Sequence, residues 1–151
     1  MFKNSFFHNR YFNYLLIMVT VIYAFIMIKL LFLRFRYSWD FYLYNLTPFE
    51  TIKQYVYNRN HYNFDTWMKN LFGNIVLFIP LGFIIPLINK RFMRILLFLL
   101  VVLTILLIVE LVQMLTRVGS FDIDDIILNS FGALIGFSIT KVLVIFMNRS
   151  N

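Results

Sequence analysis

Four long apolar runs constrain the fold of this 151-residue chain more than any other feature of its sequence. They cover residues 12–33, 71–88, 92–115 and 126–147. A helix of about 20 mostly apolar residues is long enough to cross the hydrocarbon core of a bilayer. We therefore predict an all-α integral membrane protein, in which a four-helix transmembrane bundle forms a single domain over residues 1–151.

Charge and cysteine content exclude several other classes of protein. Charged residues make up only 14% of the chain, against about 25% in soluble domains. No soluble basic face of the kind that binds nucleic acid is therefore expected. Fourteen Lys and Arg residues outnumber seven Asp and Glu residues, which favours contact with anionic membrane lipids. The absence of cysteine rules out a disulfide framework, a thiolate metal site and a cysteine nucleophile.

The distribution of Lys and Arg between the loops predicts the orientation of the bundle. The link between the second and third spans holds Lys90 and Arg91 and no acid, whereas the next link holds three aspartates. Cytoplasmic loops are enriched in Lys and Arg, so the Lys90 link and both termini are expected in the cytoplasm. The loop between the first two spans disagrees, because it would lie outside and yet carries five basic residues: Arg34, Arg36, Lys53, Arg59 and Lys69.

The loop between the first two spans is too long for a simple connector. Thr47–Glu50 has the pattern of a capping box, with Pro48 at the first helical position. We predict a short helix over residues 48–57, and the aromatic residues around it favour a position in the headgroup layer. An irregular aromatic loop packed on the bundle is the alternative.

Polar side chains within the spans gather at one depth. Asn74 and Asn129 lie near the start of their spans, and Glu110 lies near the end of its span. At 1.5 Å per residue, all three lie roughly 5–8 Å below the same membrane face. Such groups are costly inside a bilayer, so they mark a functional site or a satisfied internal pair. With their neighbours they form a predicted binding pocket: Asn74, Glu110, Gln113, Arg117, Asp122, Asp125 and Asn129.

Spacing places these residues on defined helix faces. Glu110, Gln113 and Arg117 follow i, i+3, i+7 and share one face of the third span, where Glu110 either pairs with Arg117 or is protonated. Asp122 or Asp125 is expected to cap the start of the fourth span.

One face of the fourth span combines polar and small residues: Asp125, Asn129, Gly132 and Gly136. The two glycines form a small-xxx-small pair that lets another helix approach closely, so we predict helix packing there. On this basis Gly132→Leu is expected to be disruptive and Gly132→Ala mild.

The chemistry of the pocket leaves catalysis and metal binding open. Glu110 and Asp125 are the candidate general bases, but no serine-hydrolase, phosphate-loop or zinc-protease motif is present, so a non-enzymatic protein is favoured. Asp122, Asp124 and Asp125 are hard oxygen ligands that suit Mg²⁺ or Ca²⁺. Their spacing lacks the glycine and terminal glutamate of an EF-hand loop, and no cofactor is assigned.

Four blocks of sequence resemble the VanZ-like family, in the same order: Asn45–Phe49, Gly73–Gly82, Glu110–Gln113 and Asp122–Gly136. The resemblance implies a bacterial cytoplasmic-membrane protein, in a family whose founding member confers low-level resistance to teicoplanin. Many relatives carry an arginine where this chain has Gly119, and Arg117 is the candidate replacement. The resemblance also carries over six pocket positions: Asn74, Glu110, Gln113, Asp122, Asp125 and Asn129.

Three function classes remain. We favour a binding or modulating protein whose outward pocket influences glycopeptide susceptibility or envelope lipid and cell-wall homeostasis. Its expected partners are membrane lipids and a lipid-linked cell-wall precursor or a glycopeptide, while the oligomeric state is not predicted. The second class is a membrane enzyme acting on a lipid-linked or headgroup substrate. The third is a small transporter or channel subunit, which the nearly apolar inner halves of the last three spans disfavour.

Overall fold

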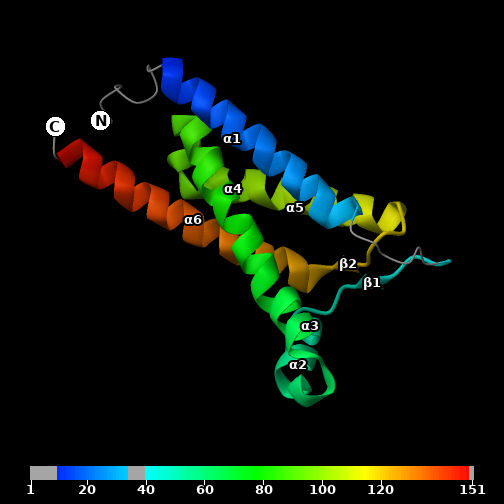
Figure 1. The fold of residues 1–151 in the computed structure, drawn as a ribbon. Coiled ribbons are helices and arrows are strands. Elements are labelled where there is room, and N and C mark those ends of the chain that lie inside the picture. The colour runs from blue at the N-terminus through cyan, green and yellow to red at the C-terminus, as the bar shows by residue number, and fades with distance from the viewer. Residues whose placement is uncertain (1–9, 34–39, 150–151) are drawn as a thin grey trace.

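The computed structural model describes residues 10–33 and 40–149, and most of these residues are helical (Figure 1). Four helical segments are long and apolar enough to cross a membrane: Arg10–Leu33, Phe64–Ile88, Ile95–Leu115 and Ile123–Met147. The predicted all-α membrane bundle with four spans is therefore confirmed.

The elements follow one another in a simple order. Helix α1 (Arg10–Ile28) continues as a π-helical turn, Lys29–Leu33. A short helix α2 (Glu50–Tyr57) and a 3-10 turn (Arg59–His61) precede α3 (Phe64–Met68). Helix α3 continues through a second π-helical turn (Lys69–Gly73) into α4 (Asn74–Ile88). A 3-10 turn (Lys90–Met93), α5 (Ile95–Leu115) and α6 (Ile123–Arg149) complete the helical elements.

All four spans begin at other residues than the apolar runs predict, and the first begins at Arg10 rather than Phe12. The second begins at Phe64 rather than Leu71, because the polar residues of α3 continue the helix beyond the apolar run. The third begins at Ile95 rather than Phe92, because Asn89 Oδ1 accepts a hydrogen bond from the Arg91 N–H (3.0 Å) and starts a separate 3-10 turn. The fourth begins at Ile123 rather than Ile126, since the helix there starts directly after a strand.

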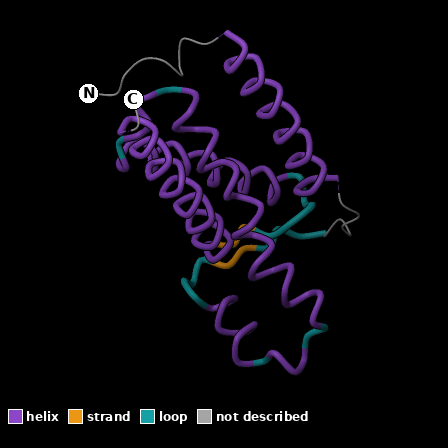
Figure 2. Tube along the Cα trace, turned by 60° about the vertical axis from the view of Figure 1, so that its left-hand side comes forward, coloured by secondary structure: helices purple, strands orange, loops and turns teal. Residues whose placement is uncertain are grey.

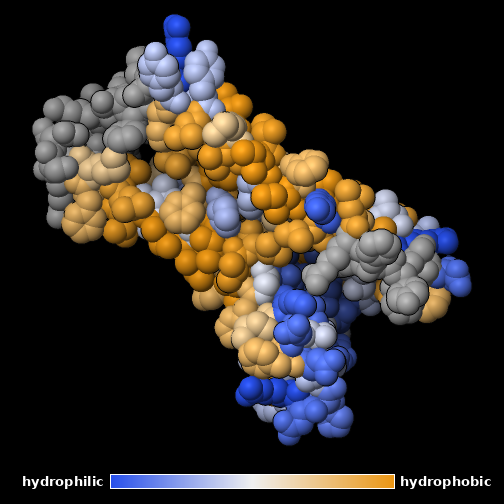
Figure 3. Space-filling model, in the orientation of Figure 1, coloured by the Kyte–Doolittle hydropathy of each residue, from blue (hydrophilic) through white to orange (hydrophobic). Residues whose placement is uncertain are grey.

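The two ends of the bundle differ. The start of α1 and the end of α6 lie at one end of the bundle, which we call the terminal end, and α2 and α3 lie at the other, the α2 end (Figure 1). Hydrophilic residues gather at the α2 end, while the surface between the two ends is mostly apolar (Figure 3). An even number of spans places the start of the first span and the end of the fourth span at the same end.

Helices α4 and α6 form the closest pair, and glycines set their distance. A Cβ atom at Gly132 would overlap the backbone carbonyl of Ile75, and one at Gly136 would overlap that of Ile79. A Cβ atom at Gly82 would overlap the Ala133 carbonyl in the same way. Gly132 and Gly136 thus lie in the contact with α4. The expectation that Gly132→Ala is mild is wrong, because the first carbon of any side chain already meets backbone.

Two prolines lie inside α4, and α6 compensates for one of them. Pro86 has no N–H, so the Gly82 carbonyl one turn earlier lacks its usual helical donor. The buried Thr140 hydroxyl of α6 lies within hydrogen-bonding distance of that carbonyl (3.4 Å), and it also donates to Gly136 in its own helix (2.9 Å). In a bilayer, a backbone group freed by proline needs such a partner from a neighbouring helix.

A hydrophobic core fills the middle of the bundle. Phe98, Val102 and Leu106 of α5 are fully buried, and the Phe98 ring stacks on Phe137 of α6 at 4.5 Å between ring centroids. Helix α1 is more peripheral, with Met27 as its one buried residue. The Tyr23 hydroxyl donates to the Leu77 carbonyl of α4 (2.9 Å). This side of the bundle is therefore held by few contacts.

A pair of two-residue strands, which the sequence did not predict, joins the first loop to the link between α5 and α6. Strand β1 (Tyr44–Asn45) runs parallel to β2 (Phe121–Asp122), with Tyr44 opposite Phe121 and Asn45 opposite Asp122. Figure 2 shows the pair in orange, between the helix bundle and the α2 region. The pairing brings the first loop onto the acidic start of α6.

Candidate functional site

Asp122 is the centre of a polar cluster at the α2 end. Its Oδ1 accepts a hydrogen bond from the Asp124 N–H (2.9 Å), so Asp122 caps α6 as the sequence suggested. Its Oδ2 accepts a hydrogen bond from the Thr51 hydroxyl (2.7 Å), and the Asn45 amide bridges Thr51 (2.9 Å) and Oδ1 (3.4 Å). The Asp122 N–H in turn donates to Oε2 of Glu110 on α5 (3.2 Å). One residue therefore ties together the first loop, α5 and α6.

Asp124 caps α2 from a different part of the chain. Its carboxylate is fully buried and accepts hydrogen bonds from the Phe49 N–H (2.6 Å) and the Ile52 N–H (3.1 Å). Phe49 has a left-handed backbone (φ 65°), and α2 begins at Glu50. The predicted capping box at Thr47–Glu50 is wrong, since a carboxylate from α6 satisfies the helix N-terminus and complements its dipole more strongly than a local hydroxyl.

Asn74 and Asp125 meet across the α4–α6 contact. The Asn74 amide donates to Asp125 Oδ1 (2.6 Å), which joins the first turns of the two helices. Asn129 follows one turn later on α6 and is only 3% exposed. Its Oδ1 is buried and has no hydrogen-bond partner among the residues that the structure describes. An acceptor thus remains unused beside the cluster.

Tyr55 is a member of the cluster that sequence reasoning missed. Its hydroxyl oxygen accepts a hydrogen bond from the Asn70 amide (2.7 Å). Burial raises the pKa of Tyr55, and the nearby Tyr62, Asp125 and Asp122 raise it further, against a smaller opposing effect of the Asn70 bond. The hydroxyl therefore stays protonated near the carboxylates. No sequence pattern pointed to this residue, because its position depends on the distant cap that holds α2.

Gln113 and Arg117 extend away from the Glu110 side chain. The Gln113 amide donates to the Leu31 carbonyl at the end of the first span (2.9 Å). Arg117 lies beyond the end of α5 with a left-handed backbone (φ 57°), and its guanidinium lies 5.1 Å from the centroid of the Tyr42 ring. At the end of α5, the Val118 N–H donates a hydrogen bond to the Gln113 carbonyl (3.1 Å). The predicted shared face of α5 therefore ends before Arg117.

The aspartates that suggested a metal site have other contacts. Over residues 10–33 and 40–149, no three acidic or histidine side chains are arranged to hold a metal ion. Asp122 and Asp124 instead accept hydrogen bonds from the first loop. The cluster can bind through hydrogen-bond acceptors, and it needs no ion to hold these two carboxylates in place.

The comparison with protein families covers this whole cluster. A family model described as VanZ/LLP1 matches residues 20–146. The chain belongs to the VanZ/LLP1 family. The match includes the first loop, the start of α6 and every residue of the polar cluster. Comparison with curated proteins and with solved structures gives no match.

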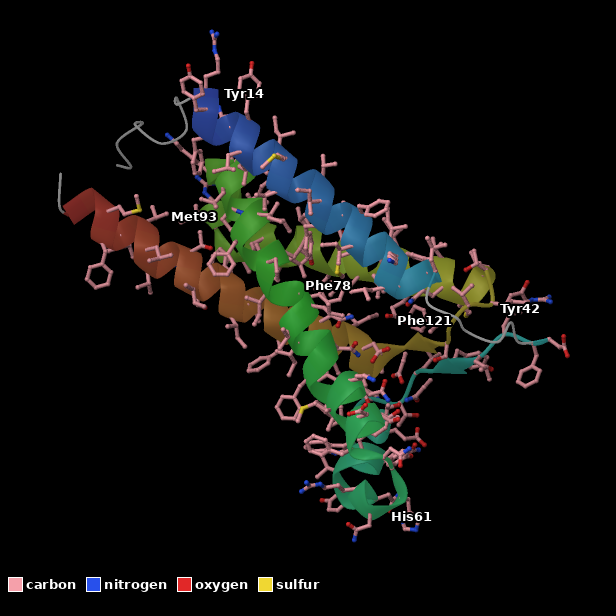
Figure 4. All side chains as sticks on the ribbon, viewed as in Figure 1. Tyr14, Tyr42, His61, Phe78, Met93 and Phe121 are labelled. Atoms are coloured by element: carbon pink, nitrogen blue, oxygen red, sulfur yellow. The ribbon has the colours of Figure 1, made fainter. Side chains whose placement is uncertain are left out.

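The polar groups of this VanZ/LLP1 cluster come from three parts of the chain. Glu110 (3% exposed) lies at the end of α5, and the three aspartates lie at the start of α6. The first loop supplies the backbone and hydroxyl donors that Asp122 and Asp124 bind. Figure 4 labels Phe121 of β2, where the first loop passes the start of α6. The arrangement is rich in acceptors, which suits a ligand that donates hydrogen bonds.

Proposed function

We propose that this VanZ/LLP1 protein is a non-enzymatic, multi-pass protein of the bacterial cytoplasmic membrane. It binds a hydrogen-bond-donating ligand at its α2 end, and this binding modulates glycopeptide (teicoplanin-type) susceptibility or envelope lipid and cell-wall homeostasis. Ligands of suitable chemistry are lipid headgroups, lipid-linked cell-wall precursors and glycopeptides, all of which present hydroxyl, amide or ammonium donors.

Charge asymmetry supports an outward-facing α2 end. All seven acidic residues lie in the first loop, at the end of α5 or at the start of α6. The turn between α4 and α5 holds Lys90, Arg91 and no acid, and Arg94 follows it directly. Basic residues without acidic neighbours favour the cytoplasmic face. The ligand site then lies at the outer face, where envelope precursors and glycopeptides are met.

The unpartnered Asn129 Oδ1 is the observation that carries the proposal. Leaving a buried acceptor without a donor costs about 1–3 kcal/mol, and α6 would avoid that cost with an apolar residue there. The acceptor lies one turn beyond Asp125, beside carboxylates that favour a donating or cationic group. A ligand donor at this position would satisfy Asn129 and gain from the surrounding negative charge.

The same contacts argue against the enzyme alternative. A general base needs a carboxylate oxygen that is aimed at the substrate. Glu110 Oε2 already accepts the Asp122 N–H, and Asp125 Oδ1 already accepts the Asn74 amide. Both candidate bases therefore hold structural contacts between the elements of the cluster.

Complementation of a deletion strain with Asn129→Leu tests the proposal. The variant removes the unused acceptor, so it should accumulate to the wild-type level and have a melting temperature in detergent no lower than that of the wild type. It should nevertheless fail to return the deletion strain to the wild-type level of glycopeptide susceptibility. Ser130→Ala is the control, because it removes a neighbouring buried hydroxyl that also has no partner among the described residues but points to another side of α6.

Unbiased lipid mass spectrometry of the same strains separates the function classes. A modulator predicts altered susceptibility with an unchanged set of lipid species. A lipid species that accumulates in the deletion strain and disappears on complementation would instead show an enzyme. Full complementation by Asn129→Leu would remove the basis for a ligand at Asn129.

A further inference from the structure

A groove between α1 and α4 lies far from the polar cluster. It has a volume of about 470 Å³, within the roughly 300–1,000 Å³ of small-molecule sites. The α1 residues that line it follow i, i+3, i+4, i+7, i+8 and so form one continuous face. The lining residues are Asn13, Leu16, Ile17, Thr20, Val21, Leu87 and Ile88.

The way α1 is attached explains why the groove opens at this place. The Tyr23 hydroxyl of α1 donates a hydrogen bond to α4, and the Gln113 amide of α5 donates one to the Leu31 carbonyl in the π-helical turn that follows α1. Both bonds hold α1 on the α2-end side of the groove. The part of α1 that precedes Tyr23 is mostly exposed, with side chains such as Ile17 (60%) and Val21 (62%) open to the surroundings.

Two arginines lie close in sequence to the lining residues of the groove. Arg10 lies three residues before Asn13 on α1, and Arg91 lies three residues after Ile88; both side chains are exposed. None of the seven acidic residues lies in α1, α4 or the turn that follows α4. Figure 4 shows Tyr14 and Met93 at this terminal end, with His61 at the opposite end of the molecule.

We propose that the groove binds an anionic phospholipid, with one acyl chain against α1 and α4 and the phosphate between Arg10 and Arg91. The groove lies within two spans, so hydrocarbon surrounds it, and a peptide strand there would leave its backbone groups unsatisfied. Arginines bind phosphate through charge-assisted hydrogen bonds, and basic sites between membrane helices bind anionic headgroups. A lipid with a net negative charge matches both the apolar groove and the two exposed arginines close to it in sequence.

Native mass spectrometry of the full-length protein with two lipids of identical acyl chains tests the charge requirement. Phosphatidylglycerol should be retained in preference to phosphatidylcholine. Since each basic residue near a membrane surface contributes about fivefold, Arg10→Gln with Arg91→Gln should lower that preference about 25-fold. Lys53→Gln with Arg59→Gln removes the same charge at the α2 end and should leave the preference unchanged. Equal retention of the two lipids by the wild type would overturn the proposal.

A second pair of variants tests the groove itself. Thr20→Phe fills it, whereas Thr104→Phe adds the same ring to the lipid-facing side of α5. The two threonines match, since each hydroxyl donates to the carbonyl four residues earlier (2.7 and 2.8 Å). Phosphatidylglycerol retention should fall at least about tenfold in Thr20→Phe, the loss expected from an acyl chain displaced from apolar contact, and stay constant in Thr104→Phe.

Val21→Phe serves as a second groove variant, because Val21 lines the groove and is 62% exposed, so the larger side chain is expected to leave the contact between the helices intact. Its control is Val142→Phe on the exposed side of α6. Unchanged phosphatidylglycerol retention in a folded groove variant would reject the acyl-chain site, even where the arginine variants reduce binding.

Discussion

At the scale of single residues, long-range hydrogen bonds decide what the acidic side chains do. Asp124 caps a helix that lies 75 positions earlier in the chain, and Asp122 holds both the first loop and its own helix. A carboxylate that accepts backbone N–H groups at a helix N-terminus gains from hydrogen bonding and from the dipole together. The polar cluster therefore has a structural role, because it holds the first loop against α6, in addition to its role as a candidate binding site.

The first prediction separates the distant cap from the local one. Asp124→Ala removes both acceptors of the α2 N-terminus and should destabilise the protein by about 1–3 kcal/mol. Thr47→Ala should change stability by less than about 0.5 kcal/mol, because the Thr47 side chain caps nothing. Thermal unfolding in detergent measures both effects. A larger loss of stability for Thr47→Ala than for Asp124→Ala would show that the capping box, and not Asp124, stabilises the start of α2.

At the scale of elements, α4 and α6 form the most closely packed pair of helices in the molecule. Glycines let their backbones touch, Thr140 lies against the carbonyl that Pro86 leaves free, and Asn74 joins the helix starts through Asp125. The sequence indicated the glycine face and the proline positions. It could not indicate which helix packs against the glycines. Residue spacing shows which residues share one face of a helix, but it does not show which other helix contacts that face.

The second prediction concerns the glycine contact. Gly132→Ala should lower the melting temperature, since its Cβ meets the Ile75 carbonyl and overpacking typically costs about 1–3 kcal/mol. Gly73→Ala is the matched control, because nothing lies within 4 Å of the added carbon. Alanine in place of a helical glycine there should be neutral or stabilising by up to about 1 kcal/mol. Equal melting of Gly132→Ala and the wild type would exclude backbone contact.

The third prediction tests the compensation of Pro86 by Thr140. Thr140→Val keeps the shape of the side chain but removes the donor, and should cost about 0.6–1.7 kcal/mol. In a Pro86→Ala background the helix regains its own N–H donor for Gly82, so the same substitution should cost less. Thr104→Val, whose hydroxyl donates only within α5, should be nearly neutral in both backgrounds. Identical costs of Thr140→Val in the two backgrounds would show that the hydroxyl and the proline act independently.

At the scale of the whole molecule, the sequence predicted what depends on local composition and missed what depends on distant pairing. Four spans follow from four apolar runs, and the common depth of Asn74 and Glu110 pointed to one end of the bundle. The β1–β2 pair, the Asp124 cap and the Gln113 bond to the Leu31 carbonyl each join segments far apart in the chain. Backbone groups are identical at every residue, so no sequence pattern marks which of them a distant side chain will bind.

The orientation of the whole molecule in the membrane determines on which side of the membrane each of the two proposed sites lies. The terminal end carries basic residues in short segments without acids, which favours a cytoplasmic position for that end, whereas every acidic residue lies toward the α2 end. The chain has no native cysteine, so single cysteines report position without interference. Ser120 and Asn89 are both exposed and lie in links at opposite ends.

The last prediction is that Ser120→Cys reacts with a membrane-impermeant maleimide on intact cells, while Asn89→Cys reacts only after the membrane is permeabilised. Labelling of both after permeabilisation is the control for accessibility of the two thiols. The reverse pattern on intact cells would place the polar cluster in the cytoplasm, out of reach of an external glycopeptide. It would also place the groove between α1 and α4 at the outer leaflet, so one measurement decides on which side of the membrane each site operates.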